Sequence, residues 1–272
     1  MQRQKSLPEE DEAFNPEIEQ LLENNAVYVE ETNRDHPDFF KSLGNNHNPK
    51  YLMIGCADAR IQPNTLLKIN PGELFIHRNI ANQIFQGDLN CNAIVQYAVE
   101  ALGIKDIIVM GHSHCGGIMA AMTQIPYQIV DQWIVGVREI FETHQEFFLK
   151  FKTADEKASA LSKINVRHQC LNLKKSAVLR RAKDSGKIIR VHGWFMNVGT
   201  GVVEDLKFNN AYKKNMQKIY SDLLMKLSIL ETEGILTDDS SKTLSNRNSS
   251  EFQFHVPQIN PKTGLFESDD QH

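Results

Sequence analysis

The sequence predicts an α/β fold, in which strands and helices alternate around one sheet. Four short apolar runs are typical of buried strands, at residues 51–54, 74–76, 107–110 and 188–191. The segments between these runs carry apolar residues at helical spacing. The chain has 272 residues, 41% of them hydrophobic, enough for one sizeable core or two small ones. We therefore expect one domain with additions.

The helices are expected between the strands. One pattern starts near Cys91, and Gly103 is placed to end it. Two longer patterns cover residues 130–152 and 155–183, and each is interpreted as a core or interface helix. An acidic, amphipathic segment at residues 16–31 precedes the first strand. It predicts an N-terminal helical arm, packed outside the sheet or on a partner subunit.

The composition changes near Gly234. Residues 234–272 are rich in Ser, Asn and Asp and show no periodicity, which predicts a polar C-terminal tail. Apolar residues such as Phe252 and Phe266 interrupt this tail and suit a protein partner. With residues 1–15 taken as a flexible acidic N-terminus, the main domain is expected at residues 16–233.

Charge and composition argue against several classes of function. The formal net charge is -4 and the basic residues are dispersed, so neither nucleic acid nor an anionic membrane is an expected partner. No stretch approaches the ~18 consecutive apolar residues that a membrane span needs. The N-terminus resembles neither a signal peptide nor a basic transit peptide, so a cytoplasmic location is expected. Four cysteines are too few for a disulfide scaffold in a chain of this length.

Two motifs follow the first and third expected strands. Cys56 ends the first strand, and His112 and Cys115 follow the third. Loops at the carboxyl ends of strands line the ligand crevice of an open α/β sheet, so these three residues can meet there. Two thiolates and one imidazole suit tetrahedral zinc and leave the fourth position open, as in catalytic sites.

Asp58 and Arg60 lie on the same loop as Cys56 and are placed to form an ion pair. A simple surface salt bridge is one interpretation. Beside a metal, the carboxylate has two other possible roles: it accepts a hydrogen bond from the nucleophile, or it occupies the fourth position unless Arg60 holds it away. Cys91 and Cys170 lie on helical patterns without acid or imidazole at ligand spacing, so they are interpreted as core residues.

Five motifs, in this order, resemble the β-carbonic anhydrase family: CADAR, PGELFIHRNIAN, DLNCNAIVQYAVEALGI, GHSHCGG and HGW. The resemblance covers residues 16 to about 233. It implies a four-stranded, mainly parallel sheet flanked by helices, a homodimer or higher homo-oligomer, and an active site at the subunit interface. It also implies one Zn²⁺ per chain and conversion of carbon dioxide to bicarbonate. By position, the zinc ligands are Cys56, His112 and Cys115, and Asp58 with Arg60 is the catalytic dyad.

The resemblance extends to a substrate wall. Phe75, Ile80 and Tyr97 match the apolar positions that receive carbon dioxide, although ordinary core packing is an alternative for Phe75 and Tyr97. His47 replaces a glutamine that donates to substrate in many members; a solvated loop histidine is the other interpretation. His114 is interpreted as facing outwards.

Some bacterial members of the family hold an inhibitory bicarbonate in a second pocket made by Trp, Arg and Tyr. Here Arg78 matches, but Met53 and Met196 stand in the two aromatic positions. Thioethers donate no hydrogen bond, so we expect no inhibition by this route and a structural ion pair for Arg78.

Two other functions compete with catalysis. A zinc-bearing structural subunit of a larger assembly would use the same fold and the C-terminal tail as an anchor. A redox-active thiol protein would favour a Cys-x-x-Cys pair, which the sequence lacks.

Overall fold

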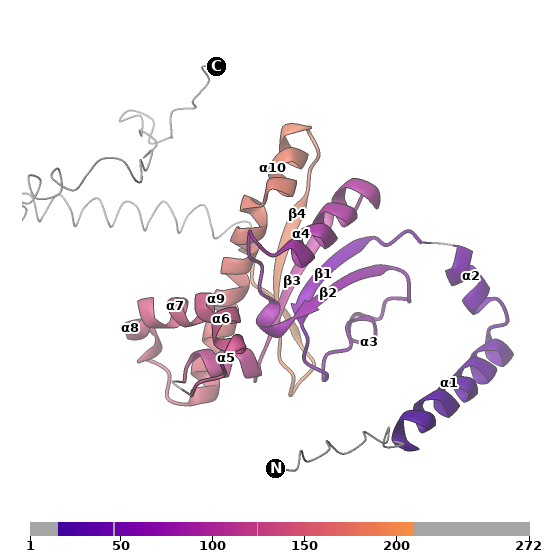
Figure 1. Ribbon diagram of the computed structural model, residues 1–272, viewed down its shortest axis with the longest axis horizontal. Helices are drawn as coiled ribbons and strands as arrows, with labels where there is room; N and C mark the ends of the chain where they lie inside the picture. Colours follow the sequence, from indigo (N-terminus) through magenta and orange to yellow (C-terminus); the bar gives the residue numbers. More distant parts are fainter. Residues whose placement is uncertain (1–15, 46, 124, 209–272) are drawn as a thin grey trace, which may run out of the picture. The chain divides into compact units, whose positions relative to one another are not determined.

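A computed structural model describes residues 16–45, 47–123 and 125–208, and a five-stranded sheet forms its centre (Figure 1). The strand order is β2-β1-β3-β4-β5. Strands β1 to β4 run parallel and β5 runs antiparallel to β4, which confirms the α/β, mainly parallel fold and adds one strand to the expected four. The strands are β1 (Tyr51–Cys56), β2 (Leu74–Asn79), β3 (Asp106–His112), β4 (Arg190–Met196) and β5 (Val203–Asp205).

The expected limits of the fourth strand were wrong. β4 begins at Arg190 and continues to Met196, and Ile188 is 74% exposed. The strand runs through Gly193, where an added Cβ would lie 3.2 Å from side-chain atoms of both Val166 and Cys170. The limits of this strand are therefore set by its pairing with β3 and by close packing against the helix that carries Val166 and Cys170, and not by the apolar run at 188–191.

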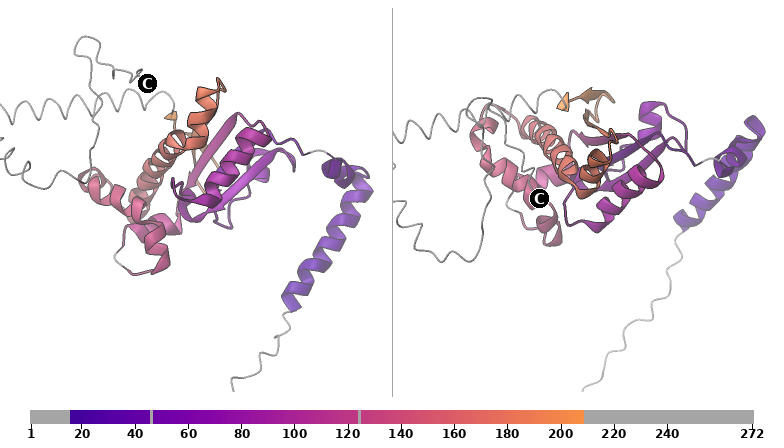
Figure 2. Two further views of the ribbon diagram at one scale, coloured as in Figure 1. Left: turned by 45° about the horizontal axis from the view of Figure 1, so that its top comes forward. Right: turned by 90° about the horizontal axis from the view of Figure 1, so that it is seen from above.

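One face of the sheet is covered by helices (Figures 1 and 2). Long helix α9 lies against β3 and β4: a Cβ on Gly111 would come within 2.6 Å of Val166 Cγ2. Helix α4 covers the β2 side, and a π-helical turn, η2, continues it until Gly103 adopts φ +66°. These elements are α4 (Leu89–Gln96), η2 (Tyr97–Ala101), α9 (Ala154–Lys175) and α10 (Ala177–Asp184).

Both long helices expected from periodicity are interrupted. Ser176 separates α9 from α10 because its backbone is extended (φ −62°, ψ 148°) and its hydroxyl accepts a hydrogen bond from the Leu179 amide. The segment 130–152 divides where Ile134 and His144 leave helical geometry. It forms α6 (Ile129–Trp133), α7 (Val135–Thr143) and α8 (Gln145–Phe148).

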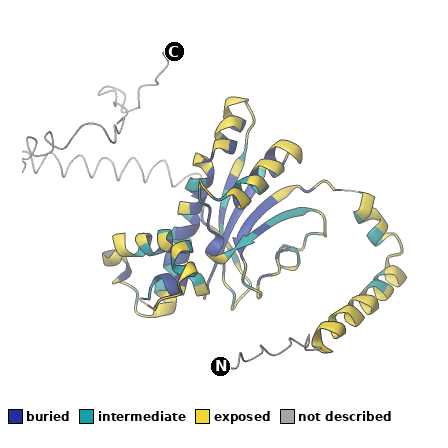
Figure 3. Cartoon of the chain, in the orientation of Figure 1, coloured by how far each residue is buried: buried dark blue, intermediate teal, exposed yellow. Residues whose placement is uncertain are grey.

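The N-terminal arm is helical, as expected, and forms α1 (Pro16–Asp35) and α2 (Phe39–Asn45). No residue of α1 is buried (Figure 3), and Leu22 is 70% exposed. Residues 209–272, including the expected tail, lie outside the described residues. None of the helices in the described ranges is both long and apolar enough to cross a membrane.

Candidate metal centre

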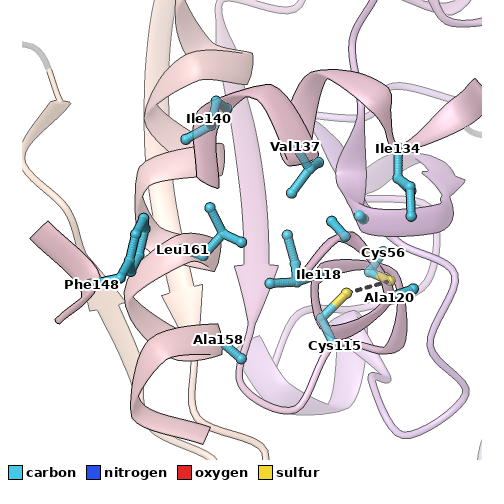
Figure 4. Close-up of a cluster of buried hydrophobic side chains, with 12 residues drawn as sticks. Cys56, Cys115, Ile118, Ala120, Ile134, Val137, Ile140, Phe148, Ala158 and Leu161 are labelled. Atoms are coloured by element: carbon cyan, nitrogen blue, oxygen red, sulfur yellow. Dashed lines mark hydrogen bonds between the residues drawn. The ribbon is translucent and has the colours of Figure 1, made fainter. Parts of the chain in front are cut away.

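The three expected metal ligands meet at the carboxyl edge of the sheet. Cys56 ends β1, His112 ends β3, and Cys115 is the N-cap of α5 (Gly116–Ala121). All three are buried, and their ligand atoms lie within 4.8 Å of one another. The two Sγ atoms are 3.8 Å apart (Figure 4). Residues from two non-adjacent parts of the chain thus form one cluster.

The cluster fits a tetrahedral zinc ion. His112 Nδ1 lies 2.8 Å from the Ser113 carbonyl, so Nδ1 carries the proton and Nε2 keeps a lone pair. Nε2 is buried and has no hydrogen-bond partner among the described residues. Two zinc–sulfur bonds of about 2.3 Å at the tetrahedral angle separate the sulfurs by about 3.8 Å. The Cys56–Cys115 spacing of 3.8 Å matches this geometry.

The two thiols share a negative charge. A hydrogen bond from the Cys115 thiol lowers the pKa of Cys56 to about 4, and His112 adds to this effect. The Cys56 thiolate in turn raises the pKa of Cys115, and burial raises that pKa further. Two thiolates at this distance repel each other unless a cation lies between them, so the site favours a divalent metal.

Asp58 faces this cluster and is held by Arg60. Arg60 Nε donates to Asp58 Oδ1 at 2.9 Å and Nη2 donates to Oδ2 at 2.6 Å. The same Nη2 lies 3.0 Å from the His114 carbonyl. The Arg60 side chain holds the pKa of Asp58 far below its usual range, so the group is a carboxylate. Asp58 Oδ2 lies 3.8 Å from His112 Nε2, beside the three expected ligands, and the two hydrogen bonds from Arg60 fix its position.

Arg78 supports the loop that carries Cys56 and Asp58. Its Nε donates to the Cys56 carbonyl at 2.8 Å, and its Nη2 donates to the Asp58 carbonyl at 2.6 Å. The expected structural ion pair is therefore replaced by two bonds to backbone carbonyls. Sequence reasoning missed this role, because only the β1–β2 register places Arg78 beside Gly55.

A second segment also donates a hydrogen bond to Cys56. Short 3₁₀ turn η1 (Ile80–Asn82) puts Ala81 at φ +59°, and the Ala81 amide hydrogen-bonds to Cys56. Buried amide side chains hold this strained turn. Gln83 Nε2 and Asn165 Nδ2 donate to the Ala81 carbonyl at 2.6 and 3.0 Å, and Gln169 Nε2 donates to Asn165 Oδ1 at 2.9 Å. Helix α9 thus fixes the backbone around a metal ligand.

The four expected substrate residues divide into two groups. Ile80 lies beside the zinc-ligand loops: a Cβ on Gly117 would come within 2.6 Å of Ile80 Cγ2. His47, Phe75 and Tyr97 form a separate cluster, with ring centroids 6.3 Å apart for His47–Phe75 and 5.9 Å for Phe75–Tyr97.

The second group is distant from the ligands of its own chain. Phe75 pairs with Leu52, whereas Cys56 pairs with Asn79. Four residues along a strand correspond to about 13 Å. Tyr97 is 50% exposed, so this aromatic cluster presents a surface outwards.

The remaining histidine and cysteine expectations had mixed outcomes. His114 faces outwards, with its side chain 49% exposed, as expected. Cys170, on α9, is fully buried against β4, also as expected. The expectation that Cys91 has no acid or imidazole nearby was wrong, because the fold brings His77 and Asp88 beside it. Burial raises the pKa of the Cys91 thiol to about 12 and lowers the pKa of His77.

The opposite face of the sheet carries an apolar cluster. Met53 and Met196 are both buried there, together with Ile61, Ile108 and Met110. Helix α3 (Pro63–Leu67) follows Ile61 and contributes Leu66. Met53 and Met196, which stand at the two aromatic positions of the inhibitory bicarbonate pocket of some bacterial members, are thus packed in an apolar cluster.

Comparisons with known proteins agree with this geometry. The sequence profile named carbonic anhydrase matches residues 51–203, more than half of the 272-residue chain. The chain belongs to the β-carbonic anhydrases. A carbonic anhydrase of Emericella nidulans is 32% identical over 204 residues, which are 75% of this chain and 90% of the relative.

Solved β-carbonic anhydrases have the same fold. A structure described as one of two tetrameric β-carbonic anhydrases from Sordaria macrospora has a TM-score of 0.67 and 30% identity, covering 71% of this chain and 98% of that one. The Coccomyxa β-carbonic anhydrase, solved with acetazolamide, has a TM-score of 0.65 and 33% identity, covering 69% and 85%. The chain is therefore a carbonic anhydrase enzyme.

Proposed function

We propose that this carbonic anhydrase hydrates carbon dioxide reversibly to bicarbonate and a proton, using one Zn²⁺ per chain held by Cys56, His112 and Cys115. One observation carries the proposal: the buried, unpartnered Nε2 of His112 faces two thiols, with a fixed carboxylate 3.8 Å away. A redox role has less support, because the sequence lacks the Cys-x-x-Cys pair typical of redox-active thiols.

When bound, zinc supplies a Lewis acid that lowers the pKa of water, which makes a hydroxide nucleophile available near neutral pH. Two thiolates balance the double charge of the metal, so this acidification is weaker than with three neutral histidines. Activity is therefore expected to rise towards alkaline pH.

Asp58 orients the attacking oxygen. Because its carboxylate stays ionised, it only accepts hydrogen bonds, and it accepts the O–H of the nucleophile while the lone pair faces the substrate carbon. The two bonds from Arg60 keep the carboxylate from turning onto the metal. Ile80, 40% exposed beside Gly117, offers an apolar contact that suits an uncharged linear molecule.

The other substrate residues act in trans in this proposal. Phe75 lies about 13 Å from Cys56 along the sheet, and His47 and Tyr97 lie beside Phe75. We therefore propose that these three residues line the site of a second copy. The exposed face of α1 gives such a homo-oligomer further apolar surface to bury. The Sordaria relative, described as tetrameric, supports association of this kind.

Metal analysis with a carbon dioxide hydration assay tests the catalytic proposal. We expect about one zinc per purified chain and measurable hydration, with zinc and activity both lost in Cys56→Ser. Asp58→Asn should keep zinc and lose most activity. A zinc-loaded wild-type protein without hydration activity would favour the structural-subunit alternative instead.

Mixed oligomers test the contribution in trans. Neither Cys56→Ser nor Phe75→Ala should be fully active alone, because one lacks zinc and the other lacks part of the wall. A hybrid of the two contains one intact zinc site faced by an intact Phe75, so co-refolding should restore activity above that of either parent. Hybrids no more active than the sum of the parents would exclude a contribution of Phe75 to the site of a second copy.

A further inference from the structure

A second group of metal-binding side chains lies between β2 and α4, apart from the catalytic cluster. His77 belongs to β2, Asp88 is the N-cap of α4, and Cys91 lies in the first turn of that helix. One ligand atom from each lies within 4.8 Å of the other two. His77 and Cys91 are 8% and 1% exposed, and Asp88 is half-buried. The group therefore has a buried interior and one side open to solvent.

Each of the three side chains has a lone pair available. Asp88 Oδ1 accepts from the Asn90 amide at 3.0 Å, which leaves Oδ2 without a partner among the described residues. His77 Nε2 makes only a long contact, 3.3 Å to Asn79 Nδ2. Asn79 Nδ2 also donates a shorter hydrogen bond, 2.8 Å, to the Gln83 carbonyl. The Cys91 thiol forms no hydrogen bond within the described ranges.

From this geometry we propose that His77, Asp88 and Cys91 form a second binding site for a divalent cation of the zinc type. One thiolate, one imidazole and one carboxylate are ligands that Zn²⁺ and Co²⁺ accept, whereas Mg²⁺ and Ca²⁺ prefer oxygen alone. On binding, the Cys91 thiol releases its proton to solvent and forms the sulfur–metal bond. The thiolate and the Asp88 carboxylate then balance the double charge, so the buried complex carries no net charge.

The second site is weaker than the catalytic one and acts on structure. Its thiol must lose a proton in an apolar environment, whereas the catalytic site has two thiols that favour an ionised form. A metal here ties β2 to α4. Because His77 precedes Arg78, which holds the Cys56 loop, the bound metal also stiffens the strand that supports the catalytic ligands.

The test uses the zinc-loaded full chain and Co²⁺ as the probe. Titration with Co²⁺ should add one ion per chain, with a thiolate-to-cobalt absorption band of single-thiolate intensity and a rise in Tm, while the catalytic zinc content stays constant. Cys91→Ala should abolish the band and the rise. Cys170→Ala is the matched control, because Cys170 is equally buried but belongs to no group of three metal-binding side chains in the described part of the chain, and it should leave both unchanged.

Asp88→Asn keeps the test decisive if Cys91→Ala folds poorly. Asparagine is an equally good N-cap, so α4 remains capped while the carboxylate is lost, and Co²⁺ affinity should fall about tenfold or more. The proposal is overturned if no second equivalent binds in a large molar excess of Co²⁺. It is equally overturned if the second equivalent persists at wild-type affinity in Cys91→Ala or Asp88→Asn.

Discussion

Replacing Arg78 by glutamine should lower both the free energy of unfolding and the affinity for zinc. The wild-type guanidinium donates to the Cys56 and Asp58 carbonyls at 2.8 and 2.6 Å. A hydrogen bond from a charged donor contributes about 1.5–3 kcal/mol, so the pair contributes about 3–6 kcal/mol in full. Arg78 is only partly buried, and the freed carbonyls regain some contact with water. We expect the free energy of unfolding to fall by about 2–4 kcal/mol.

The same change should lower zinc affinity by about 10–100-fold, as loss of groups that orient metal ligands commonly does. Urea unfolding of the zinc-loaded protein gives the first quantity, and competition with a chelator gives the second. Arg78→Lys keeps the charge but not the forked geometry, so it should fall between wild type and Arg78→Gln.

Arg190→Gln is the control for these measurements. Arg190 pairs with Asp106 at the amino ends of β3 and β4, far from the Cys56 loop. Its loss should leave zinc affinity unchanged. An Arg78→Gln protein with wild-type stability and wild-type zinc affinity would refute the supporting role assigned to this guanidinium.

Three further outcomes follow from the structure. Arg190 holds the pKa of Asp106 below its usual range. The stability that this ion pair contributes is therefore present above the unfolded pKa of about 4 and is lost as the pH falls through the lower folded value. Asp106→Asn lacks this contribution, so its unfolding free energy should fall less than that of wild type between about pH 5 and 3. Gly117→Ala should cost about 1–3 kcal/mol by overpacking against Ile80, whereas Gly116→Ala, whose Cβ meets nothing within 4 Å, should be tolerated. Initial rates against bicarbonate, at fixed pH and ionic strength, should show no steep cooperative inhibition, because Met53 and Met196 are packed in an apolar cluster.

The sequence predicted the fold class and the metal cluster because both depend on local patterns. Buried parallel strands appear as apolar runs, and polar residues directly after two such runs meet at the same edge of the sheet. Cys56, His112 and Cys115 were therefore found from strand ends alone. The N-terminal helix was also visible from its periodicity, although it ends at Asp35 and not near residue 31.

Features set by packing between distant segments were not predictable in this way. A helical pattern continues through Ser176, and only the extended backbone there shows the break. Cys91 is a core residue, as expected, but its neighbour His77 comes from another element of the fold and could not be placed beside it from the sequence. The division of the substrate residues depended on strand register, which no single segment encodes. The cytoplasmic location and the role of residues 234–272 stay predictions.

The buried amide side chains around Ala81 also bear on whether zinc binds before or after α9 docks on the sheet. Gln83 and Asn165 are 82 positions apart, and their bonds form only when α9 has docked on the sheet. All three zinc ligands are synthesised earlier, so a chain arrested on the ribosome before α9 emerges has its ligands but lacks the turn that donates to Cys56. We expect such nascent chains to bind zinc weakly and to acquire it firmly only after α9 is released and docked. In the mature enzyme, detachment of α9 should accordingly be the event that releases the metal.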